Sequence, residues 1–442
     1  MVAILLVIAV FVPYLIKFRR NQKSLKELKI EARKLGIDRP LGQYPMINRS
    51  LCIGCGACVK VCPEGDVLAV VWGTAEVING QRCVGHARCE VVCPVGALKV
   101  GLGDIRSRPD IPILTDTNET TVPGIFIAGE LGGLSLIRHA IDQGAKVVQA
   151  ISKSIEAQSS GKSGCDVLIV GAGPAGISAA LGAKQNGLNC LILDQHEVGG
   201  AILHYPRRKM VLTQPVEIPL YGKLKHGEHS KEKLLELWRE LTQRFSLDIR
   251  YGQFVNKIKK VGGVFEVETA NGSKYEASHV VLALGRRGAP RKLGVPGEEM
   301  TKVLYSLIDA QSYQNQNVLI VGGGDSAVEA AVGLAKQNTN TVSISYRKNQ
   351  FFRIKKANEK MIGKLISANK IISYFDSIVK EIRPNSVVLS SNSKEIEIPN
   401  DVVIIQAGGI LPYDMLKEIG IAFGGDSIGV AEADRKLQAV AS

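Results

Sequence analysis

The sequence predicts a multidomain α/β protein, and three features of its 442 residues lead to that prediction. Two segments repeat a pattern of apolar strand, glycine-rich turn and helix. Seven of the nine cysteines lie between Cys52 and Cys93. An uncharged apolar run opens the chain, from Val2 to Ile16. A chain of this length can form two or three domains with their own hydrophobic cores, so a single small module is excluded.

The charge of the chain is uneven as well as high. Its net charge is +13, and nine basic but only three acidic residues lie between Lys17 and Arg39. A basic segment directly after an apolar run is typical of a juxtamembrane region. No motif of interleaved aromatic and basic residues accompanies it, so we expect no nucleic-acid partner. An odd number of cysteines, crowded at metal-ligand spacings, indicates a reducing compartment rather than a disulfide scaffold.

The apolar run predicts a transmembrane anchor over residues 1–20, with the rest of the chain in the cytoplasm and the protein held as a single pass in the inner membrane. As a helix its fifteen residues would span about 22 Å, against a hydrocarbon core of about 30 Å, so Lys17 and Phe18 would have to extend it. A cleaved signal peptide is the alternative, but no basic residues precede the run. Residues 21–43 then predict a basic juxtamembrane helix, lying on the membrane or packed on the next domain.

The cysteines form two halves with the same spacing, in which a proline follows each fourth position. This spacing is typical of iron-sulfur ligands, whereas a structural zinc site needs only four donors. The segment from Tyr44 to Val100 resembles a bacterial two-cluster ferredoxin. That resemblance implies crossed ligation, in which one four-iron cluster is held by Cys52, Cys55, Cys58 and Cys93 and the other by Cys62, Cys83, His86 and Cys89.

His86 departs from the ferredoxin pattern, because a thiolate is usual at its position. A neutral imidazole makes a cluster less negative and raises its reduction potential. Two alternatives stay open: a three-iron cluster, or a histidine that does not bind beside a water-ligated iron.

The first nucleotide-binding pattern follows an apolar strand at residues 166–170. Gly171, Gly173 and Gly176 would let the backbone approach a pyrophosphate at a helix N-terminus. Asp194 ends the second strand of this unit and can bind a ribose hydroxyl.

The second pattern follows an apolar strand at residues 317–321. Its turn contains Gly322, Gly324, Asp325 and Ser326. The next strand ends without an acidic residue, and Arg347, Lys348 and Arg353 follow it. Cations there suit a 2′-phosphate and favour NADP over NAD, although an ordinary solvated turn would look the same.

Together with Ala283–Gly285 and Val295–Glu298, these two units resemble the thioredoxin-reductase-like flavoproteins from about Cys165 to Gly424. The resemblance implies an NADP-binding domain inserted into an FAD-binding domain, and a homodimer. It also implies that the strand within 401–409 returns to the flavin domain.

The family's closing flavin motif is found upstream instead, at Gly129-Glu130, where Glu130 replaces the usual Asp that contacts the ribityl chain. The simplest interpretation is a circularly permuted flavin domain, and a coincidental strand and helix is the alternative. The family's reductases of disulfides carry a Cys-x-x-Cys near the flavin. Outside the ferredoxin segment this chain has only Cys165 and Cys190, so thioredoxin reduction is disfavoured.

These features predict the following domains: an anchor, 1–20; a basic helix, 21–43; a two-cluster ferredoxin domain, 44–103; the displaced flavin-binding segment, 104–158; a linker, 159–164; an FAD-binding domain, 165–296; an NAD(P)-binding domain, 297–397; and a return segment with a tail, 398–442.

The expected function is that of a membrane-anchored flavo-iron-sulfur oxidoreductase, which transfers electrons between NAD(P)H and a one-electron donor or acceptor. Its cofactors would be FAD, NADP or NAD, and two iron-sulfur clusters, and no protein side chain is expected to act as a catalytic acid or base. The expected partner is a one-electron redox protein or a membrane electron-transfer subunit. The alternatives are a disulfide reductase without its own dithiol, and a redox-sensing subunit of a membrane complex.

Overall fold

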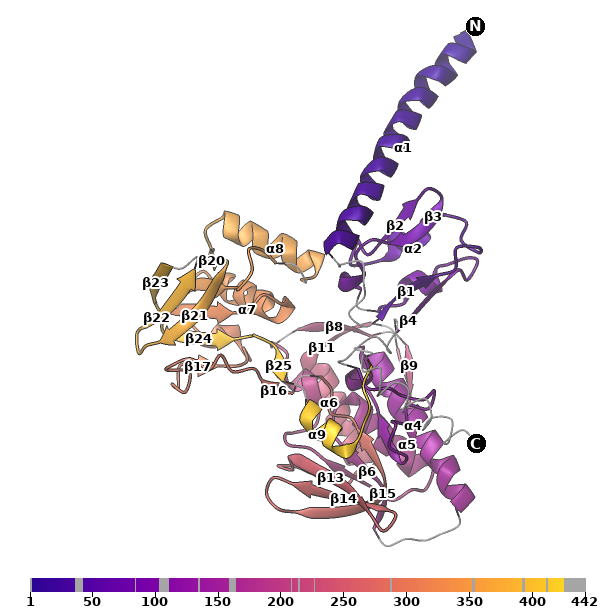
Figure 1. Cartoon of the computed structure of the whole chain (residues 1–442), viewed down its shortest axis with the longest axis vertical. Coiled ribbons are helices and arrows are strands. Elements are labelled where there is room, and N and C mark those ends of the chain that lie inside the picture. The colour runs from indigo at the N-terminus through magenta and orange to yellow at the C-terminus, as the bar shows by residue number, and fades with distance from the viewer. Residues whose placement is uncertain are drawn as a thin grey trace. The chain divides into compact units, whose positions relative to one another are not determined.

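The computed structural model describes residues 2–35, 43–83, 85–102, 111–133, 136–158, 164–207, 209–213, 215–225, 227–286, 288–351, 354–391, 394–410 and 412–424. The chain divides into two compact units (Figure 1). The first comprises Met1–Gly103 with Lys355–Ala357, and the second comprises the remaining residues.

The first unit is a small α+β domain preceded by a long helix. Its elements are α1 (Val2–Leu35), β1 (Gln43–Ile47), α2 (Ala57–Val61), β2 (Leu68–Val71), β3 (Thr74–Val77), a 3-10 turn (Gly80–Arg82), α3 (Arg88–Val91) and β4 (Leu98–Leu102). Strands β1 and β4 pair antiparallel, and β2 and β3 form a hairpin. The buried side chains of Val67, Leu68, Ala75 and Leu98 pack with the ligand-type residues Cys58 and Cys89. The core of this domain therefore forms around its cysteines.

The second half of α1 packs on the β2–β3 hairpin. The buried Gln22 side chain donates from Nε2 to the carbonyl of Val70 over 3.4 Å, and its Oε1 accepts from the Trp72 amide over 2.8 Å. Leu25 packs against the apolar residues of the hairpin, and Lys29 forms an ion pair with Glu76. Of the two arrangements expected for this segment, the structure shows the helix packed on the following domain.

The prediction of a transmembrane anchor is wrong. Within the described residues, no helix combines the length and the apolar character that are needed to cross a bilayer. The apolar run of α1 ends at Lys17 after fifteen residues, which as a helix is about 22 Å, and the remainder of α1 is rich in charge. The predicted single-pass location in the inner membrane is wrong for the same reason. The fold is therefore mixed α/β with nucleotide-binding domains, without a membrane-spanning helix in its described part.

The second unit begins with a sheet in the order β12-β7-β6-β15-β14-β13, to which β5 is added beside β15. The elements up to α6 are β5 (Ile125–Ile127), a 3-10 turn (Glu130–Gly132), α4 (Ile137–Gln158), β6 (Cys165–Val170), α5 (Pro174–Gln185), β7 (Cys190–Leu193), a 3-10 turn (Gly200–His204), β8 (Met210–Thr213), β9 (Val216–Ile218), β10 (Gly222–Leu224), β11 (Gly227–Ser230) and α6 (Lys231–Arg244). The strands β12 (Ile249–Arg250), β13 (Val255–Val261), β14 (Val264–Thr269) and β15 (Lys274–Leu282) complete it.

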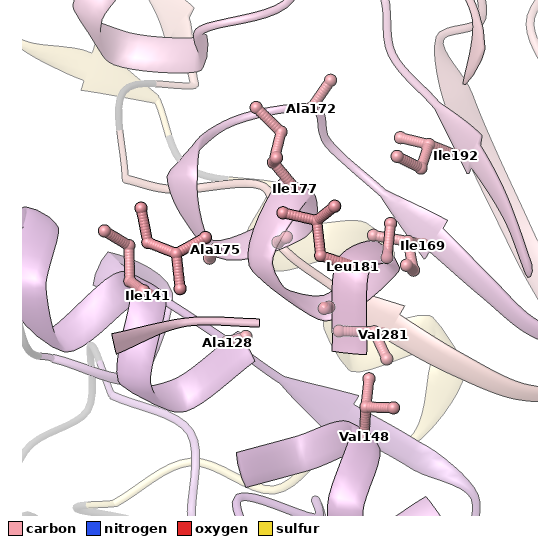
Figure 2. Packing of buried hydrophobic residues seen from close by; sticks show 14 of the residues in the cluster. Ala128, Ile141, Val148, Ile169, Ala172, Ala175, Ile177, Leu181, Ile192 and Val281 are labelled. Atoms are coloured by element: carbon pink, nitrogen blue, oxygen red, sulfur yellow. The ribbon is translucent and has the colours of Figure 1, made fainter. Parts of the chain in front are cut away.

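The segment expected to be displaced joins this sheet. Strand β5 pairs parallel with β15, with Ile125 opposite Val280, and α4 packs against α5. The helices approach closely because Gly144 faces α5: a Cβ there would lie 2.2 Å from the carbonyl oxygen of Ala175. Ser178 Oγ donates to the carbonyl of Ile141 over 2.7 Å. Figure 2 shows the shared core, with Ala128, Ile141 and Val148 from the displaced segment beside Ala175, Leu181 and Val281. This is the pairing that a circular permutation requires.

The second sheet has the order β17-β24-β18-β19-β20. Its region comprises β16 (Ala289–Pro290), β17 (Val303–Leu304), a 3-10 turn (Ala310–Ser312), β18 (Asn317–Val321), α7 (Asp325–Ala335), β19 (Thr341–Ser345), α8 (Lys356–Ser367), β20 (Ile371–Tyr374), β21 (Ser377–Ile382), β22 (Ser386–Ser391), β23 (Lys394–Pro399), β24 (Val402–Ile405), β25 (Gly409–Ile410) and α9 (Tyr413–Ile419).

Strand β24 corrects the expected boundary at residue 398. It was expected to return to the flavin domain, but it pairs parallel with β18 inside the second sheet. The return comes later: β25 pairs with β16, and Leu416, Ile421 and Phe423 pack into the core of the first sheet. The Thr121 hydroxyl accepts from the Ala422 amide over 2.9 Å, which ties the returning chain to the displaced segment.

Candidate cofactor sites

The first cavity of the small domain is lined by Cys52, Cys55, Cys58 and Cys93. Helix α2 carries Cys58, and the other three lie on loops. Two backbone amides donate to sulfur: Ala75 to Cys52 over 3.4 Å and Ala97 to Cys93 over 3.2 Å. Such bonds stabilise negative charge on ligand sulfur atoms. The structure thus brings together the first of the two expected ligand sets.

The second cavity is lined by Cys62, Cys83, His86 and Cys89. Cys89 lies on α3. This helix begins at Arg88, directly after Ala87, whose left-handed backbone has a φ of 58°. The structure thus also brings together the second expected set. In the described ranges, no three His, Cys, Asp or Glu side chains converge on the position of a single metal ion.

Burial sets the protonation of these groups in the protein without metal. It raises the pKa of Cys58, Cys62 and Cys83, and that of Cys89 to about 12. Burial also lowers the pKa of His86 to about 4. The imidazole is therefore neutral near pH 7, which is the form that binds iron, whereas the thiols must lose protons when a cluster forms.

The first glycine-rich turn joins β6 to α5. A Cβ at Gly176 would lie 1.8 Å from the carbonyl oxygen of Gly171, and Gly171 itself has a φ of 112°. The fold therefore requires glycine at both positions. Gly173 is different, because its φ is −80° and a Cβ there would meet only Gly200 Cα, at 3.7 Å. The space beside Gly173, at the N-terminus of α5, fits a pyrophosphate.

Asp194 lies next to this turn. Its Oδ2 accepts from the Ala172 amide over 2.5 Å, and its Oδ1 accepts from the His196 amide over 2.7 Å. Burial raises the pKa of this carboxyl group, while the two amides and the nearby His196 oppose that rise. The carboxylate keeps further lone pairs for a ribose hydroxyl.

Sequence reasoning missed the pair Gly199–Gly200. A Cβ at Gly200 would lie 2.9 Å from Gly173 Cα, so this pair closes over the glycine-rich turn. The Gly199 amide donates to the carbonyl of Ala172 over 2.9 Å. The available signal was the adjacent glycines a few residues after Asp194.

Gly129, which precedes Glu130, also lies beside the first turn of α5. The Ala128 amide donates to the carbonyl of Leu282, and a Cβ at Gly129 would lie 3.2 Å from Ala175 Cβ in the first turn of α5. Burial raises the pKa of Glu130, and the charge of Arg286 partly offsets that rise. Arg286 is thus a second group that the sequence analysis did not assign to this site.

The second glycine-rich turn joins β18 to α7. A Cβ at Gly322 would lie 2.4 Å from the carbonyl oxygen of Gln406. Gly324 has a φ of −96° and no atom within 4 Å of a Cβ built there. Neither the backbone nor the packing requires glycine at Gly324, so the open space at the N-terminus of α7 fits a ligand phosphate. Asp325 and Ser326 form the first turn of α7.

Arg347 and Lys348 follow β19 after one residue, Tyr346, and the parallel pairing of β19 with β18 brings them to the same sheet edge as Gly322. Both side chains are exposed, as binding of a ligand phosphate requires. Arg353 lies outside the described residues.

Cys165 and Cys190 lie away from both turns. Each is the first residue of its strand, β6 or β7, whereas the glycine-rich turn follows the last residue of β6. Burial raises the pKa of each thiol to about 11. These cysteines therefore sit at the amino ends of strands whose carboxyl ends lead into the glycine-rich turn and Asp194.

Comparisons with known proteins agree with this geometry. A family model for pyridine nucleotide-disulphide oxidoreductases matches residues 168–435, and one for 4Fe-4S dicluster domains matches residues 44–94. Ferredoxin–NADP reductase of Ignicoccus hospitalis is 30% identical over 278 residues, which are 61% of this chain and 86% of that protein. Bacilliredoxin reductase Bdr of Bacillus subtilis is 29% identical over 260 residues, 58% of this chain and 80% of that protein.

Among solved structures, bacillithiol disulfide reductase Bdr (YpdA) from Staphylococcus aureus is similar with a TM-score of 0.52 and 27% identity, over 58% of this chain and 80% of that one. The chain therefore belongs to the pyridine nucleotide-disulphide oxidoreductase family, and it is an FAD-dependent oxidoreductase that carries a 4Fe-4S dicluster domain in the same polypeptide.

Proposed function

We propose that this protein transfers electrons between NADPH and a one-electron redox partner. The observation that carries the proposal is the presence, in one chain, of two glycine-rich nucleotide turns and two cavities with four ligand-type side chains each. FAD, when bound, exchanges electrons in pairs with a nicotinamide and singly with iron-sulfur clusters.

The first turn would hold the FAD. The N-terminus of α5, beside Gly173, would bind the pyrophosphate, and Asp194 would bind a ribose hydroxyl. Glu130 would reach the ribityl chain from the displaced segment. Because Glu130 is partly buried, it would also help to exclude water from the cofactor.

The second turn would hold the nicotinamide nucleotide. Gly324 would leave room for the pyrophosphate at the N-terminus of α7, and Arg347 and Lys348 would bind the 2′-phosphate. No acidic residue ends β19, so an unphosphorylated ribose lacks its usual carboxylate partner. We therefore propose NADPH rather than NADH.

The small domain would hold two four-iron clusters with crossed ligation, as the two cavities suggest. His86 would bind iron through a neutral imidazole in the second cavity. One thiolate fewer would make that cluster less negative than the cluster of the first cavity, and its reduction potential higher.

The relatives support electron transfer without fixing its direction. Several are named ferredoxin–NADP reductase, which fits a one-electron partner that acts as donor or acceptor. A homodimer and the absence of a nucleic-acid partner stay predictions.

Reduction of a low-molecular-weight disulfide is the second candidate, because relatives named bacilliredoxin reductase and bacillithiol disulfide reductase share the fold. Such a substrate would have to react at the flavin directly, since Cys165 and Cys190 lie at the amino ends of their strands. This function would leave the two cysteine-rich cavities without a role.

Steady-state oxidation of NADPH distinguishes the two functions. We expect the purified chain to reduce cytochrome c, and we expect a Cys58→Ser/Cys89→Ser variant, which lacks one ligand in each cavity, to lose that activity but keep its FAD. Bacillithiol disulfide should be a poor acceptor for both proteins. Equal cytochrome c reduction by the two proteins, or efficient disulfide reduction by both, would contradict the proposal.

A further inference from the structure

Tyr346 has the same place in the second nucleotide-binding unit as Asp194 has in the first. In both units the amide of the first glycine of the turn, Gly171 or Gly322, donates to the carbonyl of the last residue of the second strand, over 2.8 Å and 3.0 Å. The residue after that strand is Asp194 in the first unit and Tyr346 in the second. The same hydrogen bond therefore puts a carboxylate in one unit and an aromatic ring in the other at equivalent positions.

The ring of Tyr346 lies against the second glycine-rich turn. A Cβ built at Gly323 would lie 2.3 Å from the ring carbons Cδ2 and Cε2, and 2.4 Å from Cζ. The backbone of Gly323 does not itself require glycine, because its φ lies outside the left-handed region. The equivalent residue of the first turn is Ala172, whose amide donates to Asp194 Oδ2. A glycine thus replaces the alanine where an aromatic ring replaces the carboxylate.

Neighbouring groups hold this ring in place. Phe351 stacks on it, with ring centroids 5.8 Å apart and an angle of 13° between the planes, and Phe375 meets Phe351 edge to face at 5.1 Å. The Tyr346 amide donates to the carbonyl of Tyr374 over 2.9 Å, and the Tyr346 carbonyl accepts from the Ser377 amide over 3.1 Å. The packing of the chain itself therefore sets the position of the ring.

We propose that Tyr346 is a specificity-determining residue of the second nucleotide site, where its ring selects a dinucleotide with a 2′-phosphate over one without it. The inference rests on the proposed function and adds to it the residue that discriminates between the two nucleotides. Phe351, which contacts the ring, is then a positioning residue, because it acts through Tyr346.

Two effects of the ring act in the same direction. A carboxylate in this position accepts hydrogen bonds from an unphosphorylated ribose, and ring carbons offer no acceptor in its place. A carboxylate would also repel a 2′-phosphate at short range, whereas an aromatic ring carries no net charge. The guanidinium of Arg347, the next residue, can therefore pair with the phosphate without a competing anion at this position.

ADP-ribose and 2′-phospho-ADP-ribose provide the probes, because they differ only in the 2′-phosphate and carry no nicotinamide. Calorimetry with the oxidised, FAD-loaded full-length protein measures their binding without electron transfer. We expect the unmodified protein to bind the phosphorylated probe about tenfold more tightly or better. Equal binding of the two probes would overturn the proposed NADPH preference together with this inference. A selective protein whose variants all keep that selectivity would overturn the inference alone.

Exchanging the ring for a carboxylate tests the discrimination. Gly323→Ala with Tyr346→Asp gives the second turn the residues of the first. It should weaken binding of 2′-phospho-ADP-ribose about tenfold and strengthen binding of ADP-ribose about threefold. Tyr346→Phe keeps the ring and should change each affinity less than about twofold. Loss of selectivity in Tyr346→Phe would overturn the proposal.

Thr341→Asp is the matched control for the added charge. Thr341 is exposed at the amino end of β19, whereas Tyr346 follows the carboxyl end of the same strand. This variant should change both affinities less than about twofold. Stoichiometric FAD and a cooperative thermal melt show that each variant is folded. Equal effects of the two aspartate substitutions would overturn the proposal.

Two uncharged changes test the held ring even where the carboxylate variant does not fold. Gly323→Ala alone adds a methyl group that must displace the ring, and Phe351→Leu removes the ring that stacks on it. Each should lower the ratio of the two probe affinities about threefold. A merely structural role of these residues would weaken both probes equally. A ratio that neither change alters would overturn the proposal and leave electron transfer to a one-electron partner untouched.

Discussion

The two cysteine-rich cavities share one spacing and differ at a single donor. Cys55 occupies the second position of the first half, and His86 the second position of the second half. Cys55 is an exposed thiol, whereas the imidazole of His86 is partly buried and neutral near pH 7, because burial lowers its pKa to about 4. The shared spacing builds a similar cavity twice, and the donor at the second position sets the charge within it.

The two glycine-rich turns differ in a similar way. Gly176 of the first turn is required by contact with the chain itself, whereas Gly324 of the second faces open space. In the unit of the first turn, the second strand, β7, is followed by the carboxylate of Asp194. In the unit of the second turn, the second strand, β19, is followed by the cations Arg347 and Lys348. In both pairs the local fold is repeated, and the residues differ at a few positions.

The largest expected effect comes from filling the first turn. Gly176→Val places side-chain atoms within contact of the Gly171 carbonyl, which should destabilise the turn by about 3 kcal/mol or more and abolish FAD binding. Gly324→Ala is the matched change in the second turn. It should preserve the melting temperature and the FAD while weakening NADPH binding about tenfold. Flavin absorbance and thermal melts measure both, and stoichiometric FAD in the Gly176 variant would show that the turns do not differ as described.

Exchanging the second-position donors should reverse the difference between the cavities. His86→Cys adds a thiolate and should lower the reduction potential of the second cluster, whereas Cys55→His should raise that of the first, each by on the order of 100 mV. Redox titration followed by EPR measures both potentials. A potential unmoved by His86→Cys would mean that His86 does not bind iron.

Removing one cation tests the difference between the ends of the two units. Arg347→Ala should weaken NADPH binding about tenfold, because one charge-assisted contact to the 2′-phosphate is lost, and should leave NADH binding unchanged. Anaerobic flavin reduction at increasing concentrations of each nucleotide gives the two affinities. An equal loss for both nucleotides would remove the basis for NADPH preference.

The smallest effect concerns support of the first cavity by α1. Gln22 holds the turn that contains Trp72, and the neighbouring Gly73 packs on the ligand loop, since a Cβ at Gly54 would lie 2.2 Å from the Gly73 carbonyl oxygen. Gln22→Ala should destabilise the small domain by about 1 kcal/mol. It should alter the EPR signal of the first cluster more than that of the second.

The exposed neighbour Lys23→Ala is the control for this change and should have no effect on either signal. Equal disturbance of both clusters by Gln22→Ala would argue against a specific link between α1 and the first cavity.

The donors of both cavities could be predicted from the sequence, because their spacing is local and regular. The glycine-rich turns could be predicted for the same reason. The closure of Gly199–Gly200 over Gly173 could not, since it depends on the long-range approach of Leu235, whose side chain would lie 2.4 Å from a Cβ at Gly199.

Two errors have a common cause. Strand β24 is apolar throughout, and a fully buried strand gives no periodic signal that assigns it to one sheet or another. The apolar start of α1 was interpreted as a transmembrane span from hydrophobicity and flanking charge, although its length was short of a bilayer. Hydrophobicity alone shows that a segment avoids water, but not which partner covers it.

We propose above all that electrons exchange between NADPH and the clusters of this chain. The most direct test of this exchange is anaerobic EPR of the purified protein in both directions: oxidised clusters with excess NADPH, and dithionite-reduced clusters with excess NADP⁺. We predict flavin bleaching with cluster reduction in the first case, or NADPH formation with cluster oxidation in the second. Clusters that stay oxidised in the first experiment and reduced in the second would contradict the claim.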